Sequence, residues 1–479
     1  MDPAPKRSRL DFQVASTSTS YSSVNNFTKQ IIQTGEIFRL NDDCFEAIFC
    51  WLCAEDLPAF SETCVRIHSL VKIYFVRRYA NKRTEIERLN GIIAVKKYAP
   101  LKDVIQSIAF CGDHKPQKTW DWELQYKHNH VNDLLLYYMQ SECNKHPRFL
   151  SFERMALNKM DGACIANALE TVDEAVFQNC ELDDFYTNIL RYCDNIKRLT
   201  VKKCDIIYAE DTSWLNQRYP TLESLKIHLD ASLDLSVLDE FFAQNSQIKK
   251  FAYISRLSKH PTKIDKVLCA IRHLQLEELF LTFAVACKFH DIYAQLLVIS
   301  QQPQFKRLAL EFGSCLVKDI LIDNLNNLAC LDKLYALHIR DVDFAKDLPT
   351  NIDVLTNLKE LYLNHTPNTA YAAEKLAMIT PNLELLVIRD SVYYTPSFAD
   401  FVQPFIEFLP KLKKIVLSYD VFSGFKQRIP ALNEKRQKLQ GACPVHIWLP
   451  LKFPLKEQPT IVGKSLIQIR PMLDVYEHY

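Results

Sequence analysis

The residues that could carry chemistry by type and spacing are two short thiol motifs. Cys50 and Cys53 form a Cys-x-x-Cys pair, and Cys143 and His146 form a Cys-x-x-His pair. Both spacings could supply half of a zinc site, and the first is also typical of redox dithiols. Neither pair has a second pair at zinc spacing, and Cys50 and Cys53 fall in an apolar helical pattern. We interpret them as structural and predict no metal site.

Other signatures of catalysis are missing from the sequence. It contains no Walker loop, dinucleotide fingerprint, HExxH helix or nucleophile elbow. Only eight of the 479 residues are glycine, which argues against glycine-rich phosphate loops. The sequence therefore predicts no catalytic residues and no cofactor. An enzyme based on Cys50 and Cys53 is kept only as an alternative.

Charge and composition narrow the class of partner. The 58 basic and 57 acidic residues leave a net charge of +1, which gives no overall attraction to nucleic acid or to an anionic membrane. No apolar run approaches the ~20 residues of a membrane span, and the N-terminus lacks a hydrophobic signal core. The fifteen cysteines are scattered, so we expect them to be reduced. We predict a cytoplasmic or nuclear protein without nucleic-acid or membrane partners.

Residues 1–35 and 37–80 have contrasting patterns. The first segment is rich in serine and threonine and poor in large apolar residues, so we predict a disordered tail. In the second, Phe45, Ile48 and Phe49 begin a helical apolar stripe after an Asn/Asp cluster typical of an N-cap. Two further helical patterns follow. Such a small core usually needs a partner.

The residues of this module resemble the F-box family. The family pattern is Leu-Pro, an acidic pair, apolar positions leading into Ile-Phe and Leu, then Asp-Leu and Val-Cys. The matching segments here are Leu40-Asn41-Asp42-Asp43-Cys44-Phe45-Glu46-Ala47-Ile48-Phe49-Cys50-Trp51-Leu52, Glu55-Asp56-Leu57 and Cys64. Asn41 replaces the proline, Cys44 replaces a leucine, and Thr63 precedes Cys64.

The resemblance implies a partner for residues 36–80. F-box proteins bind the Skp-type adaptor, which links them to a cullin scaffold in SCF ubiquitin ligases. By this resemblance the adaptor-binding candidates are Leu40, Asn41, Cys44, Phe45, Ile48, Leu52, Leu57 and Cys64. The apolar ones would be shared between the module's own core and the adaptor. Which side each residue faces is open at the level of sequence.

The rest of the chain carries an internal repeat. The pattern apolar-x-x-apolar-x-apolar recurs at spacings of 20 to 29 residues, which is typical of leucine-rich repeats with one strand and one helix each. It begins at Phe152, Val172, Ile196, Leu222, Ile248, Leu276, Phe305, Leu334, Leu358, Leu383 and Leu412. The x-x pair is doubly charged in eight of these eleven repeats, although chance would give about one in seventeen.

The repeats predict an α/β fold. It is a leucine-rich-repeat solenoid, a horseshoe with a parallel β-sheet on the concave face and helices on the convex face, preceded by the small all-α F-box. We expect about 11–12 repeats over 104–450, a linker helix over 81–103 and a tail over 451–479. Ile105 would begin a divergent first repeat, and residues 445–448 would form the closing strand. Cys180 and Cys204 resemble the cysteine-containing intracellular subclass of these repeats.

Strand alternation assigns side chains to the concave face. The outward positions hold nine Lys or Arg and four Glu, a net of +5, and four of the basic residues fall on three consecutive repeats. Phe280, Tyr362 and Val387 are expected to be exposed apolar residues there. The target-binding candidates are Arg198, Lys202, Lys226, Lys250, Phe280 and Tyr362. The patch is either an ordinary solvated face or a seat for an acidic or phosphorylated segment.

These features resemble the F-box/leucine-rich-repeat family of SCF substrate receptors. The resemblance implies that the repeats hold a protein target while the F-box binds the Skp-type adaptor and, through it, the cullin scaffold. Ubiquitin transfer would then belong to partner subunits, so this chain would not be an enzyme. The alternative is an interaction scaffold that works without any ligase.

Overall fold

The structure is a computed structural model. It describes residues 39–52, 56–78, 83–89, 92–96, 105–112, 131–141, 143–204, 212–229, 236–254, 263–283, 289–312, 328–340, 353–364, 370–389, 398–417, 427–450 and 465–472. The predicted disordered tail at 1–35 lies outside these residues. The described residues fall into two compact units. The helical unit lies within Met1–Thr84, Val95–Gln106 and Glu142–Asn144, and the repeat unit lies within Glu85–Ala94, Ser107–Ser141 and Lys145–Tyr479.

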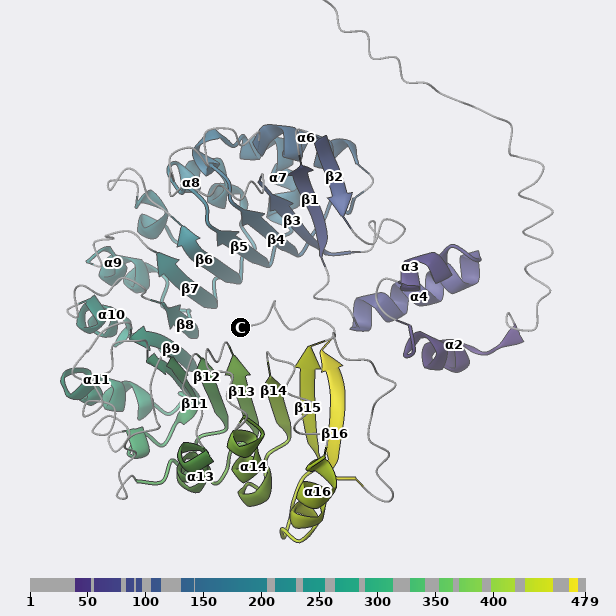
Figure 1. Ribbon diagram of the computed structural model, residues 1–479. Helices are drawn as coiled ribbons and strands as arrows, with labels where there is room; N and C mark the ends of the chain where they lie inside the picture. Colours follow the sequence, from purple (N-terminus) through teal and green to yellow (C-terminus); the bar gives the residue numbers. More distant parts are fainter. Residues whose placement is uncertain are drawn as a thin grey trace, which may run out of the picture. The chain divides into compact units, whose positions relative to one another are not determined.

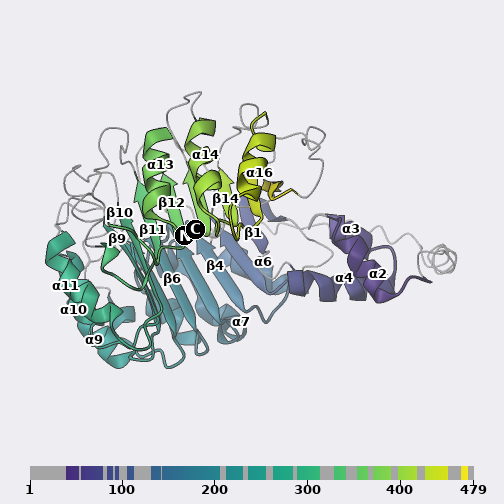
Figure 2. The ribbon, with the colours of Figure 1, turned by 90° about the horizontal axis from the view of Figure 1, so that it is seen from below.

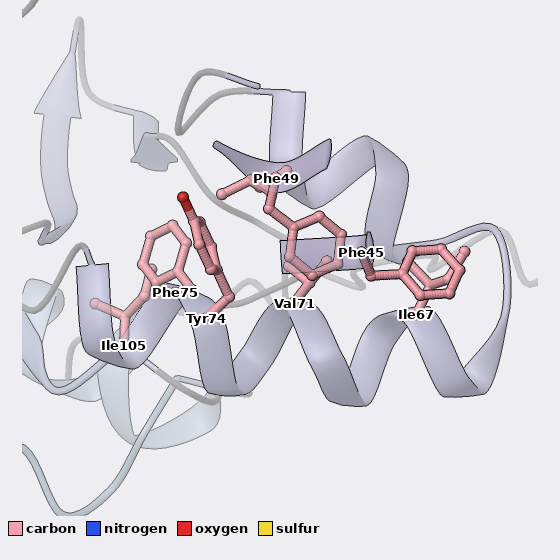
Figure 3. Close-up of a cluster of buried hydrophobic side chains, with 8 residues drawn as sticks. Phe45, Phe49, Ile67, Val71, Tyr74, Phe75 and Ile105 are labelled. Carbon is pink, nitrogen blue, oxygen red and sulfur yellow. The ribbon is translucent and has the colours of Figure 1, made fainter. Parts of the chain in front are cut away.

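The helical unit holds the three helices that the sequence predicts, α2 (Asp42–Phe49), α3 (Asp56–Ser61) and α4 (Val65–Arg78). Asn41 is the N-cap of α2, where its Oδ1 accepts a hydrogen bond from Cys44 N at 2.9 Å. The three helices enclose one apolar cluster (Figure 3), whose buried members are Phe45, Phe49, Leu57, Ile67, Val71, Tyr74, Phe75 and Ile105.

Two exposed ion pairs also join α4 to α2. Arg66 Nη2 donates to Asp42 Oδ1 at 2.7 Å and to the carbonyl oxygen of Leu40 at 2.9 Å. Arg77 Nη1 lies 2.9 Å from Glu46 Oε1. Exposed pairs of this kind contribute about 0–1 kcal/mol each, so the apolar cluster supplies most of the stability of the unit.

The repeat unit is built on a 16-stranded sheet (Figure 1) with the order β16-β15-β14-β13-β12-β11-β10-β9-β8-β7-β6-β5-β4-β3-β1-β2. Neighbours from β3 to β16 pair in parallel. The strands are β1 (Thr84–Leu89), β2 (Ile92–Lys96), β3 (Ser107–Cys111), β4 (Phe149–Glu153), β5 (Glu174–Gln178), β6 (Arg198–Cys204), β7 (Ser224–Leu229), β8 (Lys250–Tyr253), β9 (Glu278–Phe283), β10 (Arg307–Phe312), β11 (Leu334–Arg340), β12 (Glu360–Asn364), β13 (Leu385–Arg389), β14 (Lys414–Leu417), β15 (Val445–Pro450) and β16 (Ile467–Met472).

Helices form an outer layer beside this sheet (Figure 2). The α-helices are α6 (Val131–Gln140), α7 (Ala166–Glu170), α8 (Phe185–Asn188), α9 (Val237–Gln244), α10 (Lys263–Ile271), α11 (Phe289–Ser300), α13 (Ala370–Ile379), α14 (Phe398–Phe408) and α16 (Ile429–Gln437). Short 3₁₀ helices occur in the early repeats at Leu157–Lys159, Gly162–Ile165, Leu190–Tyr192 and Ser213–Asn216. This arrangement is the predicted leucine-rich-repeat solenoid, with strands on the concave side and helices on the convex side.

Equivalent apolar residues of successive repeats stack inside the solenoid. The rings of Phe110, Phe152 and Phe177 lie 5.2 Å apart from one strand to the next, and all three side chains are fully buried. In the two repeats with the predicted cysteines, the Cys204 thiol accepts a hydrogen bond from Cys180 N at 3.4 Å. Burial and the neighbouring Cys180 thiol raise the pKa of Cys204, which makes it an inert core residue.

Ion pairs between repeats explain the charged doublets of the sequence. The residue directly before a strand alternates in sign over seven consecutive repeats: Arg148, Asp173, Lys197, Glu223, Lys249, Glu277 and Lys306. Within this row, which we call the rim row, Asp173 pairs with both Arg148 and Lys197. Glu384 later pairs with Lys359 and Lys413, at 3.1 and 2.6 Å. The doublets therefore stabilise the stack of repeats.

Three sequence predictions about the repeat array are wrong. The segment predicted as a linker helix over 81–103 contains β1 and β2, because β-branched residues such as Ile92, Ile93 and Val95 favour extended structure. The predicted tail at 451–479 contains β16, which pairs in parallel with β15, so the strand at 445–448 does not close the sheet.

The third correction concerns the first full repeat. Leu150 and Phe152 pair with Ala175 and Phe177, so this repeat begins five residues before the predicted start at Phe152. In the predicted register Ala156 occupies an outward position, four residues after Phe152, but it is fully buried. Phe152 and the apolar residues after β4 also fit the apolar-x-x-apolar-x-apolar pattern. The prediction therefore began this repeat at Phe152 instead of five residues earlier. The divergent first repeat is confirmed, since Ile108 in β3 pairs with Leu150.

One β-bulge changes the alignment of the later strands. Leu308 in β10 pairs with Leu334 in β11, but the next residue, Ala309, pairs with Ala336. Tyr335 is therefore the extra residue, and the Arg307 guanidinium lies 3.9 Å from the centre of its ring. Beyond the bulge, Ala336 aligns with Glu360 of β12, whereas Tyr362 aligns with His338.

We predict that Asp173→Asn lowers the stability of the repeat unit by about 1 kcal/mol at pH 7, because it removes two partly screened ion pairs. Burial raises the pKa of Asp173, but hydrogen bonds from Arg148 and Lys197 outweigh burial, so the pKa lies below its ordinary value. The difference in the free energy of unfolding between wild type and Asp173→Asn should have its full value above about pH 5 and shrink below about pH 4. Urea denaturation at several pH values measures it.

Asp332→Asn is the matched control for this prediction, because Asp332 is exposed and has no ion pair with the described residues. It should leave the stability unchanged across the same pH range. A variant at Asp173 that is as stable as wild type at pH 7 would show that the rim row does not contribute to stacking.

Candidate functional site

A large pocket lies on the concave face of the repeat unit. Its volume is about 1040 Å³, and its lining comes from strands β5 to β13 and the residues directly after β8. The six residues predicted to bind a target all belong to this lining: Arg198, Lys202, Lys226, Lys250, Phe280 and Tyr362. The structure thus brings them together in one cavity.

Two of the four predicted basic residues are already neutralised. Arg198 Nε lies 2.6 Å from Glu174 Oε2 on the neighbouring strand, and Lys250 Nζ lies 2.9 Å from Glu278 Oε1. Their charges are offset within the sheet. The predicted patch of four cations is therefore reduced to two, Lys202 and Lys226.

The side-chain ammonium groups of Lys202 and Lys226 have neither a hydrogen bond nor an ion pair with the described residues. Burial and the charge of Lys202 lower the pKa of Lys226, while Glu311 of β10 acts in the opposite direction. Glu311 Oε2 itself accepts a hydrogen bond from Thr282 Oγ1 at 3.2 Å. Two neighbouring ammonium groups without a dedicated counter-ion thus face the cavity.

An aromatic cluster forms another part of the lining. The rings of His338 and Tyr362 are stacked with centres 3.9 Å apart, and Phe280 meets His338 edge to face at 5.4 Å. Tyr362 is only 4% exposed and donates a hydrogen bond from its hydroxyl to Glu360 Oε2 at 2.8 Å. Phe280 and His338 keep partial exposure and can contact a ligand.

The prediction that Tyr362 and Val387 are exposed is wrong. Both are nearly fully buried, in an apolar cluster with Ala336 and Val416 on the same face of the sheet. Tyr362, Val387 and Val416 lie in register on the three adjacent strands β12 to β14, so their side chains cover one another. This cluster is part of the structure of the array and is not an open anchor site.

Glu311, His338 and Arg389 occupy outward positions in the repeats that begin at Phe305, Leu334 and Leu383, but they are not among the predicted site residues. Burial together with the positive charges of Arg389 and Lys226 lowers the pKa of His338 to about 3. Lys226 on β7 and Arg389 on β13 thus act on one side chain, although many strands separate them in the sheet. Alternation predicts which face a residue occupies, but only the curvature brings distant strands together.

The helical unit divides the predicted adaptor-binding residues into three groups. Phe45 and Leu57 are fully buried in its core, and Asn41 caps α2, so these three have structural roles. Four others are partly buried and pack against the same core: Leu40, Ile48, Leu52 and Cys64. Cys44 is exposed.

One face of α2 and the turn after it is open to solvent, although Ile48 on this face also packs against the edge of the core. Cys44, Ala47, Ile48 and Trp51 follow i, i+3, i+4 and i+7, and all are at least partly exposed. Trp51, in the turn after α2, is 90% exposed. We call these four residues the α2 outer face. The sequence analysis did not select Trp51, although its spacing from Cys44 was the signal that could have identified it.

The described residues contain no group of three or more His, Cys, Asp or Glu placed to hold a metal ion. Among the same residues, no helix has the length and apolar character needed to span a bilayer.

Comparison with known proteins gives one family match. Residues 37–78 match the F-box domain family, so the chain carries an F-box domain formed by α2, α3 and α4. No curated protein sequence matches the chain.

Two solved structures are similar to it at 11% identity. One is the TLR13-ssRNA13 complex, with a TM-score of 0.34, covering 76% of this chain and 58% of that chain. The other is the Toll-Spatzle complex from Drosophila, with a TM-score of 0.26, covering 66% and 49%. The chain therefore spans less than two thirds of the length of either.

We predict that His338 makes the repeat unit sensitive to mild acid. Its folded pKa of about 3 lies below the unfolded value of 6.5, so the stability present above pH 6.5 is lost as the pH falls. Between pH 7 and pH 5 the wild type should lose about 2 kcal/mol more than the His338→Gln variant, which cannot titrate there. Urea denaturation of both proteins at the two pH values checks this, and equal losses would contradict it.

Proposed function

We propose that this chain is the substrate-recognition subunit of an SCF-type ubiquitin ligase. The observation that supports the proposal is the presence in one chain of an F-box domain and of a sheet with a large, partly charged pocket. The F-box would bind the Skp-type adaptor and, through it, the cullin scaffold. The concave face would hold a protein target.

In this function the chain acts by proximity and not by chemistry. Holding the target and the ligase in one complex converts a bimolecular encounter into an effectively intramolecular one. The catalytic groups belong to partner subunits, so this chain needs no cofactor. The absence of a predicted nucleophile or phosphate loop in the sequence is consistent with this role.

The adaptor would dock on the α2 outer face. A well-packed interface needs exposed apolar side chains that become buried on binding, and aromatic residues are frequent anchors in such interfaces. Trp51 is the most exposed large apolar side chain among the described residues, and Ile48 lies one turn before it. Phe45 and Leu57 would support this surface from inside the module.

We predict that Trp51→Glu in the full-length chain abolishes copurification with the Skp-type adaptor without unfolding the F-box. The side chain is 90% exposed, so its replacement leaves the core intact, whereas a charge in the binding surface opposes association. Circular dichroism and thermal denaturation verify folding. Leu52 is a poorer site for this test, because it packs against the core.

Ile73→Glu is the matched control, since Ile73 is half exposed and lies on α4 instead of α2. Copurification should survive this change. Loss with Ile73→Glu and retention with Trp51→Glu would move the docking surface to α4. A wild-type chain that never copurifies with the adaptor would favour the ligase-independent scaffold.

A further inference from the structure

The outer side of α4 carries exposed apolar residues that the proposed function does not use. Val65, Ile73 and Val76 are 76%, 50% and 41% exposed. Together with Trp51 they are four of the ten large apolar side chains that are exposed among the described residues, although the helical unit is the smaller of the two units. Single exposed apolar residues need no explanation, but several on one element mark an interaction surface.

These residues form one stripe along the helix. Val65, Ser69, Ile73 and Val76 follow i, i+4, i+8 and i+11, which places them on one face over about three turns. Ser69 Oγ donates a hydrogen bond to the carbonyl oxygen of Val65 at 3.1 Å, so its hydroxyl is already satisfied within the helix. The small serine leaves room for a close neighbour between Val65 and Ile73. We call these four residues the α4 stripe.

The α4 stripe lies on the opposite side of the helix from the F-box core. Ile67, Val71 and Tyr74 belong to the buried cluster shown in Figure 3, and each lies two residues from a member of the stripe. Two residues of an α-helix correspond to a rotation of about 200°. The core side of α4 is therefore covered by the module itself, and the stripe is left as a second surface beside the α2 outer face.

The charges that border the α4 stripe are all basic. The helix contains four Lys or Arg and no Asp or Glu. Lys72 lies one turn before Val76 at one margin of the stripe, and Arg77 lies one turn after Ile73 at the other margin, where Arg66 also lies. Arg66 and Arg77 pair with carboxylates of α2, but their side chains stay 45% and 66% exposed. Both margins can therefore still meet a carboxylate of a partner.

The basic margins and the residue types decide between possible occupants. A second copy of the chain would bring two basic helices together, which like-charge repulsion disfavours. The stripe holds only valine, isoleucine and serine, whereas helices that lie on membranes use Trp, Phe and Leu for contact with lipid. An acidic helix with an apolar stripe of its own complements both the shape and the charge of this face.

We propose that the α4 stripe binds an acidic amphipathic helix of a second partner protein, distinct from the adaptor. The apolar side chains of that helix pack on Val65, Ile73 and Val76, and its carboxylates meet Lys72 and Arg77. Because valine and isoleucine are already fixed at χ1 in a helix, they lose little side-chain freedom on binding. The inference depends neither on the concave pocket nor on adaptor binding at the α2 outer face.

The test measures binding of three labelled peptide libraries to the full-length chain by fluorescence anisotropy. Each peptide has about 16 residues, enough to cover the three turns of the stripe as a helix. The acidic library has Leu, Ile or Val at positions i, i+4, i+7 and i+11 and mainly Glu elsewhere. The basic library has Lys in place of Glu, and the shuffled library keeps the acidic composition without the spacing. We expect the acidic library to bind about tenfold more tightly than the other two.

Three substitutions locate this binding on α4. Ile73→Glu should weaken binding of the acidic library about tenfold, because it removes an apolar contact and adds a like charge. Val65→Ser should weaken it about threefold, and it leaves the core intact because Val65 is the most exposed member of the stripe. Lys72→Glu should lower the preference for the acidic over the basic library about threefold.

Trp51→Glu is the matched control, since it places the same charge on an exposed apolar position of the same module. It should leave binding of the acidic library unchanged. Adaptor copurification should show the reverse pattern, lost with Trp51→Glu and retained with Ile73→Glu. Excess adaptor should not displace the acidic library. Failure of the α4 site is thereby distinguished from failure of adaptor binding.

Four results would overturn the proposal. Equal binding of the acidic and shuffled libraries would mean that charge alone attracts them, and equal binding of the acidic and basic libraries would remove the role of charge. A wild-type dimer in sedimentation that Ile73→Glu converts to a monomer would make a second copy the occupant. Binding to phosphatidylserine vesicles that Ile73→Glu abolishes, without a preference for the acidic library, would assign the stripe to a membrane.

Discussion

Pairing between neighbouring strands is the interaction on which the rest of the repeat unit depends. At the start of most strands one carbonyl oxygen accepts two backbone N–H groups of the next repeat. Asp173 O, for example, accepts from Lys197 N at 2.8 Å and Arg198 N at 2.9 Å. A single repeat cannot satisfy these groups or bury its apolar face. Curvature, pocket and charge distribution therefore exist only in the assembled stack.

The charged residues of the rim row and those of the concave face differ in how far their charges cancel. In the rim row, opposite charges meet and cancel, as between Asp173 and its two basic partners, Arg148 and Lys197. On the concave face the side chains of Lys202 and Lys226 line the pocket without an ion pair to the described residues. A chain with almost no net charge can thus present a local positive site, because its acids are used in holding the repeats together.

The sequence predicted the parts of this structure that depend on local pattern. Apolar spacing located most strands, and the Asn/Asp cluster located the start of α2, where Asn41 is the cap. The prediction of strand position failed around Phe152, where the apolar pattern fits two registers. The prediction of exposure failed for Tyr362, because its burial depends on side chains of neighbouring strands. The convergence of Lys226 and Arg389 on His338 depends on curvature, which spacing does not encode.

The bulge at Tyr335 sets which residues can cooperate in the concave face. Because one residue is added within β11, His338 and Tyr362 align with Glu311, whereas Glu360 aligns with Ala309 through Ala336. Gain or loss of a whole repeat would lengthen or shorten the array but leave the surviving rows in step. An insertion or deletion of a single amino acid within a strand would instead re-phase every row downstream of it. Divergence of binding preference in such arrays can therefore come from one codon, without any substitution among the residues that touch the target.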